Sequence, residues 1–137
     1  MKQSKAFWKS LFFLGFAILT LIVQQVNGHL FQVSTPEELI KVFQGAGGSV
    51  SDDIELLADL NFSKSSLTLP LGATSNGNCI PFSGKMNWNG HTIMSLKMDN
   101  ADKSGYKHAG LFCDLRNAKI ENLVIDSSCS FRGSYVG

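Results

Sequence analysis

The chain has 137 residues, of which 12 are basic and 11 acidic, and its formal net charge is +1. The only charged residues among the first 28 are three lysines, and without them the net charge is near −2. This balance gives no clustered basic surface, so we expect neither a nucleic-acid partner nor attraction to anionic lipid. The residues after position 28 suffice for one domain.

The N-terminus has the pattern of a secretory signal peptide. Lysines precede the apolar run Leu11–Val23, whose 13 residues fall short of the roughly 20 that span a bilayer. Val26 and Gly28 fit the −3 and −1 positions of a cleavage site, so residues 1–28 are the predicted signal peptide and His29 begins the mature chain. The alternative is an uncleaved signal anchor, which would hold the protein at the membrane. Both interpretations predict a secreted or cell-surface protein.

Three cysteines, Cys79, Cys113 and Cys129, would enter an oxidising compartment with an exported chain. One disulfide among them is predicted, and the sequence does not choose between the three pairings. The alternative is that each is a small buried side chain in a β-core. Their spacing lacks the CxxC and Cys/His patterns of zinc sites. Asn61, in Asn-Phe-Ser, is a candidate acceptor for an N-linked glycan.

A short amphipathic helix is predicted over residues 35–44. Thr35 suits the N-cap, Pro36 suits the first helical position, and Glu38 completes a capping box. The glycines that begin at Gly45 end the helix. Residues 29–50, which contain this helix and the Gly-rich loop after it, are predicted to form an N-terminal capping region.

Residues 51–137 are predicted to be β-structure. Strands are expected over 54–62, 92–98 and 120–125, each bounded by turn-forming residues. The pattern Ile-x-x-Leu-x-(Met/Ile)-Asp occurs at 93–99 and again at 120–126, an offset of 27 residues. Such a period is typical of solenoids, in which repeats bury their apolar faces by stacking. We therefore expect the first copy to stack on the second.

Three motifs resemble the GLUG-type, pectin-lyase-like repeats of secreted and surface proteins. They are FSGKMNWNGHTI at 82–93, AGLF at 109–112 and AKIENL at 118–123. Trp88 and Cys113 depart from the family pattern, which usually has Gly at both positions. The resemblance implies an all-β fold, a right-handed parallel β-helix or solenoid capped by the N-terminal helix. It also implies an incomplete, N-terminal portion of a longer repeat protein, the alternative being a short version with an exposed C-terminal edge.

The sequence predicts no catalytic, cofactor-binding or metal site. Five acidic residues fit turns at loop or strand ends: Asp52, Asp53, Asp99, Asp102 and Asp126. His91 belongs to the consensus of the repeat that the chain resembles, while His29 and His108 lack a second histidine or a carboxylate at ligand or triad spacing. Arg116 and Arg132 stand singly. We expect none of these residues to perform catalysis.

Two functions from different classes follow. The first is a non-catalytic adhesion, recognition or structural role outside the cell, with glycans or cell-surface proteins as partners. The alternative is the N-terminal part of a polysaccharide lyase or glycoside hydrolase whose catalytic residues lie beyond Gly137. The open reading frame past that residue would discriminate, because an enzyme needs further acidic and basic residues at one strand position.

Overall fold

The computed structural model describes residues 29–46, 49–102 and 105–136. The predicted signal peptide, residues 1–28, lies outside the described residues. The described chain begins with β1 (Leu30–Val33) and the helix α2 (Pro36–Gln44). The elements that follow are β2 (Asp53–Leu56), β3 (Leu60–Asn61), the 3₁₀ turn η1 (Phe62–Lys64), β4 (Lys85–Asn87), β5 (Thr92–Met94), β6 (Lys97–Asp99), β7 (His108–Ala109), β8 (Lys119–Glu121), β9 (Val124–Ile125), β10 (Ser130–Arg132) and β11 (Tyr135–Val136).

The predicted helix is confirmed as α2, with the capping box that its sequence indicates. The Thr35 hydroxyl accepts a hydrogen bond from the Glu38 amide at 3.2 Å, and the Glu38 carboxylate accepts one from the Thr35 amide, also at 3.2 Å. Leu39 and Phe43 on its apolar face are buried. The Phe43 ring lies 5.8 Å from that of Phe82. The helix thus supplies part of the core.

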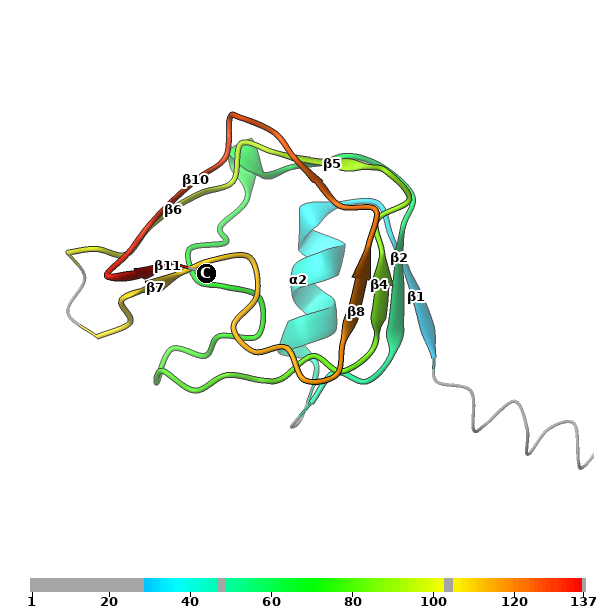
Figure 1. Cartoon of the computed structure of the whole chain (residues 1–137), viewed down its shortest axis with the longest axis horizontal. Helices are drawn as coiled ribbons and strands as arrows, with labels where there is room; N and C mark the ends of the chain where they lie inside the picture. The colour runs from blue at the N-terminus through cyan, green and yellow to red at the C-terminus, as the bar shows by residue number, and fades with distance from the viewer. Residues whose placement is uncertain (1–28, 47–48, 103–104, 137) are drawn as a thin grey trace, which may run out of the picture.

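The strands form four small parallel sheets (Figure 1). Their orders are β1-β2-β4-β8, β3-β5-β9, β6-β10 and β7-β11. After β2, consecutive strands belong to different sheets. When the chain returns to a sheet, it adds the next strand at the edge of that sheet. Strands β8, β9, β10 and β11 each end a sheet as a consequence.

The predicted fold class is wrong. Instead of an all-β, right-handed parallel β-helix, the described residues form four separate small sheets and one helix, a mixed α/β arrangement without a closed solenoid. Each long strand expected from the sequence is interrupted and becomes two short ones. Ser95 and Asn122 interrupt two of them with φ values of 57° and 56°, which lie outside the extended region.

The predicted stacking of the two sequence copies is also wrong. Met86 pairs with Ile120, and Ile93 pairs with Ile125, so partners lie 34 and 32 residues apart rather than 27. The first copy spans β5 and β6, whereas the second spans β8 and β9. The copies therefore begin in different sheets and cannot lie in register.

The two departures from the repeat pattern have structural reasons. Trp88 is completely buried, so a large apolar side chain fills the core where the repeat pattern has glycine. Cys113 forms a disulfide with Cys79. Gly84 lies where a Cβ would collide with the Asp52 carbonyl, so a larger residue does not fit there.

Candidate functional site

The carboxylates of Asp52, Asp53, Asp99 and Asp126 accept hydrogen bonds from backbone amides. Asp52 accepts from the His29 amide at 3.2 Å, and Asp53 accepts from the Lys85 amide at 3.0 Å. The Ser128 hydroxyl is the main cause that lowers the pKa of the Asp126 carboxyl. The Ser128 amide, which donates to that carboxyl at 2.8 Å, is the second cause. Asp99 binds the Ala101 amide at 3.3 Å and Arg132 at 3.5 Å, and Arg116 pairs with Asp114 at 2.9 Å. Asp102 is exposed.

His91 contacts a carboxylate that sequence reasoning did not pair with it. Its Nδ1 lies 3.2 Å from Asp59 Oδ1, which also accepts the Thr92 amide at 2.8 Å. The backbone bond from Thr92, followed by the bond from His91, lowers the pKa of Asp59. The carboxylate therefore joins two turns. Within residues 29–46, 49–102 and 105–136, no group of three or more His, Cys, Asp and Glu side chains could hold a metal ion.

Three aromatic side chains gather at the sheet formed by β7 and β11. His108 pairs with Tyr135 across the two strands, and their rings are stacked with centroids 5.0 Å apart. The Tyr106 ring is tilted against that of His108, with a centroid distance of 5.1 Å. Tyr135 is 65% exposed, His108 is exposed and Tyr106 is half-buried. We call these three residues the aromatic strip.

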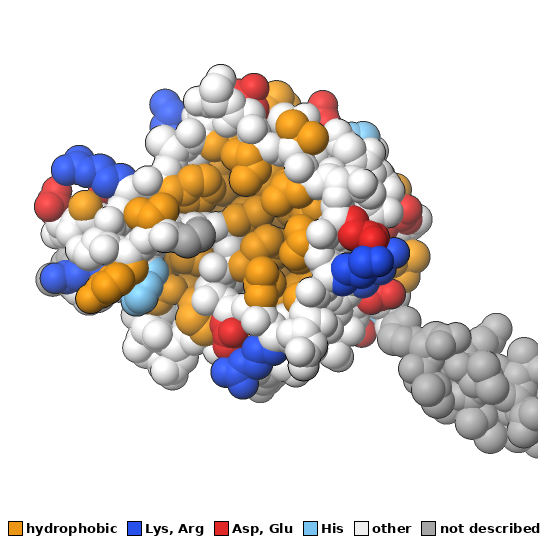
Figure 2. Space-filling model, viewed as in Figure 1, with side chains coloured by type: hydrophobic (Ala, Val, Ile, Leu, Met, Phe, Trp, Pro, Cys, Tyr) orange, Lys and Arg blue, Asp and Glu red, His pale blue; other side chains and the backbone are white. Residues whose placement is uncertain are grey.

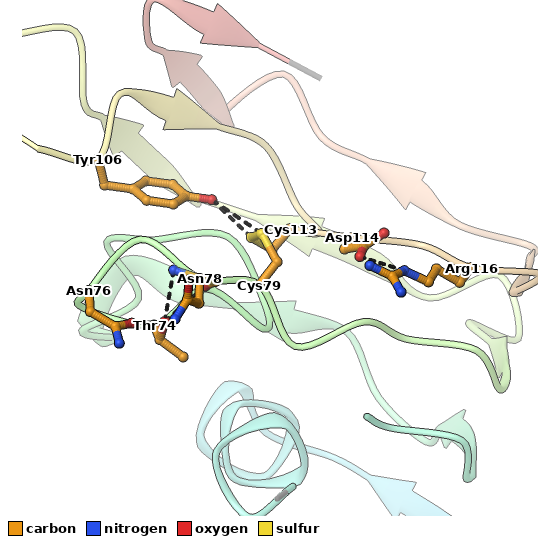
Figure 3. The surroundings of a disulfide bond; sticks show 8 residues. All are labelled: Thr74, Asn76, Asn78, Cys79, Tyr106, Cys113, Asp114 and Arg116. Carbon is orange, nitrogen blue, oxygen red and sulfur yellow. Dashed lines mark hydrogen bonds and ion pairs between the residues drawn. A yellow bond between two sulfur atoms is a disulfide. The ribbon is translucent and has the colours of Figure 1, made fainter. Parts of the chain in front are cut away.

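A disulfide supports one end of the aromatic strip (Figure 3). Cys79 and Cys113 are joined, with their Cα atoms 5.5 Å apart, and Cys129 remains a thiol. The Tyr106 hydroxyl lies 3.0 Å from Cys113 Sγ and must be the donor, because a disulfide sulfur carries no hydrogen. Burial raises the pKa of Tyr106, so its hydroxyl keeps its proton at neutral pH.

A buried amide fixes the segment that carries Tyr106 and His108. Asn100 is completely buried, and its Nδ2 donates to the carbonyls of Thr68 at 3.1 Å and His108 at 2.8 Å. Its backbone amide donates to the Arg132 carbonyl at 2.7 Å. One side chain therefore joins the end of β6 to the start of β7, which limits the positions open to the aromatic strip.

Two hollows flank the aromatic strip, and Tyr106 and His108 line both of them. The first, of about 280 Å³, is otherwise lined by Pro70, Gly77, Cys79, Ala109, Phe112, Cys113, Tyr135 and Val136. The second, of about 310 Å³, is otherwise lined by Ser75, Asn76, Gly77 and Gly105. No Lys, Arg, Asp or Glu is among these lining residues. The first hollow is therefore mainly apolar, and the second carries the hydroxyl of Ser75 and the amide of Asn76.

The polar side of the site is a short hairpin closed by backbone bonds. The Thr74 amide donates to the Asn78 carbonyl at 2.9 Å, and the Ile80 amide donates to the Gly72 carbonyl at 2.7 Å. Gly77 has a φ of 86°, which suits a tight turn. The disulfide at Cys79 joins the hairpin to Cys113. This bond limits the movement of the backbone that carries the exposed polar side chains.

Comparisons with known proteins assign nothing to this site. No family model, curated protein or solved structure matches the chain. The resemblance to GLUG-type repeats stays an interpretation of the motifs. No helix in the described part of the chain is long and apolar enough to cross a membrane.

The sequence reasoning missed the aromatic strip. It named His108 only as a histidine without a partner at ligand spacing, and it did not consider Tyr106 or Tyr135 as site residues. The spacing Tyr106-x-His108 was an available signal, because residues two apart in an extended segment lie on one face. The place of Tyr135 follows only from strand pairing. Asn61, the candidate glycan acceptor, is exposed, and its Oδ1 accepts from the Ser63 amide at 3.0 Å.

Proposed function

We propose that this protein is a secreted or cell-surface recognition domain that binds uncharged glycans at the aromatic strip without cleaving them. The observation that carries the proposal is the cluster of Tyr106, His108 and Tyr135, of which His108 and Tyr135 are exposed and stacked, beside a hydroxyl and amide hairpin. A protein exported by its signal peptide would meet glycans outside the cell, which agrees with the predicted compartment.

The chemistry of a sugar ring matches this surface. One face of a pyranose presents C–H bonds, which are attracted to the negative face of an aromatic ring, while its edge presents hydroxyl groups. The aromatic strip supplies the rings, and Ser75 and Asn76 supply donors and acceptors nearby. Because neither Lys nor Arg lines either hollow to pair with a carboxylate, the site favours neutral sugars over uronic acids.

Export predicts a defined N-terminus for the mature protein. When the whole 137-residue chain is expressed in a secretory host, we expect protein in the medium that begins at His29, because Val26 and Gly28 fit the cleavage site. Intact-mass measurement checks this result. Membrane-bound protein that retains Met1 would show that the segment is an anchor instead.

Binding should depend on the exposed end of the aromatic strip. Tyr135→Ala is expected to weaken binding of the best neutral oligosaccharide about tenfold, because it removes a stacking face worth roughly 0.5–1.5 kcal/mol together with its buried area. Tyr135→Phe keeps the ring and should bind nearly as well as the wild type. Calorimetric titration with cello-, xylo-, manno- and galacto-oligosaccharides measures both effects.

A matched control lies at the opposite end of the described chain. Phe31 stacks on His29 with centroids 4.7 Å apart, so Phe31→Ala removes an aromatic contact far in sequence from the aromatic strip. This variant should bind like the wild type. Equal loss in the Phe31 and Tyr135 variants would argue against a local site, and release of reducing ends from any oligosaccharide would contradict binding without cleavage.

A further inference from the structure

The turn after β3 exposes an asparagine that takes no part in the aromatic strip. Asn61 ends β3, and its two neighbours in sequence, Leu60 and Phe62, are buried, whereas Asn61 between them is exposed. Strand β5, which pairs with β3, runs along the rim of the molecule in Figure 1. Figure 2 shows mostly polar side chains on this rim around a hydrophobic centre.

A hydrogen bond at this turn identifies the two ends of the Asn61 amide. One end lies 3.0 Å from the backbone nitrogen of Ser63, whose N–H can only donate, so that end is Oδ1. The other end is Nδ2. The cap of η1 therefore uses the oxygen and leaves the nitrogen available for reaction. Ser63, whose hydroxyl completes the Asn-x-Ser acceptor sequence, is exposed as well.

A hollow of about 410 Å³ begins at the residue after Asn61. Four serines supply its hydroxyl groups, namely Ser63, Ser65, Ser95 and Ser128. Phe62 and Leu96 contribute apolar lining. Asn61 pairs with Met94, and Ser95 is the next residue along, so the hollow lies one strand position from Asn61. We call this cavity the hydroxyl hollow.

We propose that Asn61 carries an N-linked glycan whose first N-acetylglucosamine rests in the hydroxyl hollow. The donor is a lipid-linked oligosaccharide diphosphate in the compartment through which the chain is exported. Asn61 Nδ2 forms a bond to C1 of the first sugar, the bond from C1 to the diphosphate oxygen breaks, and Nδ2 gives up one proton. Oδ1 stays an amide oxygen, so the product keeps the cap on Ser63.

The chemistry of this sugar fits the hydroxyl hollow. The Ser65 hydroxyl accepts from the Leu67 amide at 3.3 Å, and the Ser128 hydroxyl accepts from the Ser95 amide at 2.8 Å. Each hydroxyl keeps its own proton to donate. The acetamide and hydroxyl oxygens of N-acetylglucosamine accept such protons, and its methyl group suits the apolar lining.

Expression of the full chain in a eukaryotic secretory host that keeps its glycans in the oligomannose form tests the modification. The secreted protein is expected to exceed its polypeptide mass until peptide N-glycosidase removes the glycan, and peptide mapping should then find deamidation at Asn61. Ser63→Ala should lose the glycan although the backbone N–H that binds Asn61 remains. Ser63→Thr, the matched control, should keep it. Secreted protein that has the bare polypeptide mass, or a glycan at another residue, overturns the proposal whether or not the aromatic strip binds sugar.

Enzymatic trimming tests the place of the first sugar. An endoglycosidase that leaves one N-acetylglucosamine should leave Tm unchanged. Complete removal should lower Tm by about 4–8 °C, the effect of one net hydrogen bond in a domain near this size. Ser63→Ala should have the Tm of the fully deglycosylated protein, because the cap survives in both. Equal Tm values for the single-sugar and fully deglycosylated forms would overturn the contact with the hydroxyl hollow.

Discussion

Ile93→Asp is expected to abolish secretion of the folded protein. Ile93 is 1% exposed and lies between Leu60 and Ile125 in the sheet β3-β5-β9. A carboxylate there would be buried without a partner, at a cost of several kcal/mol, roughly the whole stability of a domain of this size. Immunoblots of medium and cell lysate, followed by limited proteolysis, measure the effect.

Ile125→Asp is the matched control, because it makes the same change one strand further along the same row. Ile125 is 48% exposed, so a carboxylate there stays hydrated and the variant should still be secreted and resist protease. If the two variants behave alike, or if Ile93→Asp is secreted like the wild type, the packing of β5 between β3 and β9 is incorrect.

Removal of the disulfide by Cys79→Ala/Cys113→Ala is expected to lower the unfolding free energy by about 3–4 kcal/mol. The bond closes a loop of 34 residues, and the estimate follows from the entropy that this closure removes from the unfolded chain. For a domain near this size, such a loss lowers Tm by roughly 10–25 °C. Thermal unfolding followed by circular dichroism provides the measurement.

The disulfide also supports Tyr106, so the same double variant should bind glycan more weakly than the wild type. Cys129→Ala is its control, since Cys129 is a thiol whose Sγ lies 3.4 Å from the Ile93 carbonyl and takes no part in the aromatic strip. This variant should keep its glycan affinity and lose far less stability. An unchanged Tm in the double variant would contradict the assigned pairing.

Local signals in the sequence predicted local structure well. The helix α2 was predictable because its N-cap, its proline and its capping box lie within four residues. Turn-forming residues such as Asn and Gly were also visible in the sequence, and Asn89 does adopt a φ of 49°. Its side-chain amide donates to the Leu56 carbonyl at 2.8 Å. The helix cap and the Asn89 turn depend on neighbours in sequence, whereas the Asn89 bond to Leu56 joins residues 33 apart.

The pairing of strands into sheets was not predictable from the sequence. A 27-residue sequence repeat was taken as the structural offset, whereas β4 and β8 pair at 34 residues and β5 and β9 at 32. The apolar residues of a strand show that one face is buried but not which strand lies beside it. Interruptions at Ser95 and Asn122 then divided the expected strands, and a sheet that looked continuous in sequence became several.

The candidate site was the least predictable part, because it depends on pairing between distant segments. Tyr135 reaches His108 only through the register of β11 on β7, and Tyr106 is placed by Asn100 and the disulfide. Sequence reasoning looked for titratable groups at catalytic spacing. It therefore passed over the aromatic strip, whose flanking hollows are lined by no Lys, Arg, Asp or Glu.

A two-dimensional ¹H–¹⁵N correlation spectrum tests most directly whether the aromatic strip binds neutral glycan. Uniformly ¹⁵N-labelled secreted protein would be titrated with the oligosaccharide that binds best in calorimetry. We expect saturable shifts at the amides of Tyr106, His108 and Tyr135 and of the hairpin at Asn76, with little change in α2. Shifts confined to other surfaces, or none at millimolar oligosaccharide, would contradict the proposal.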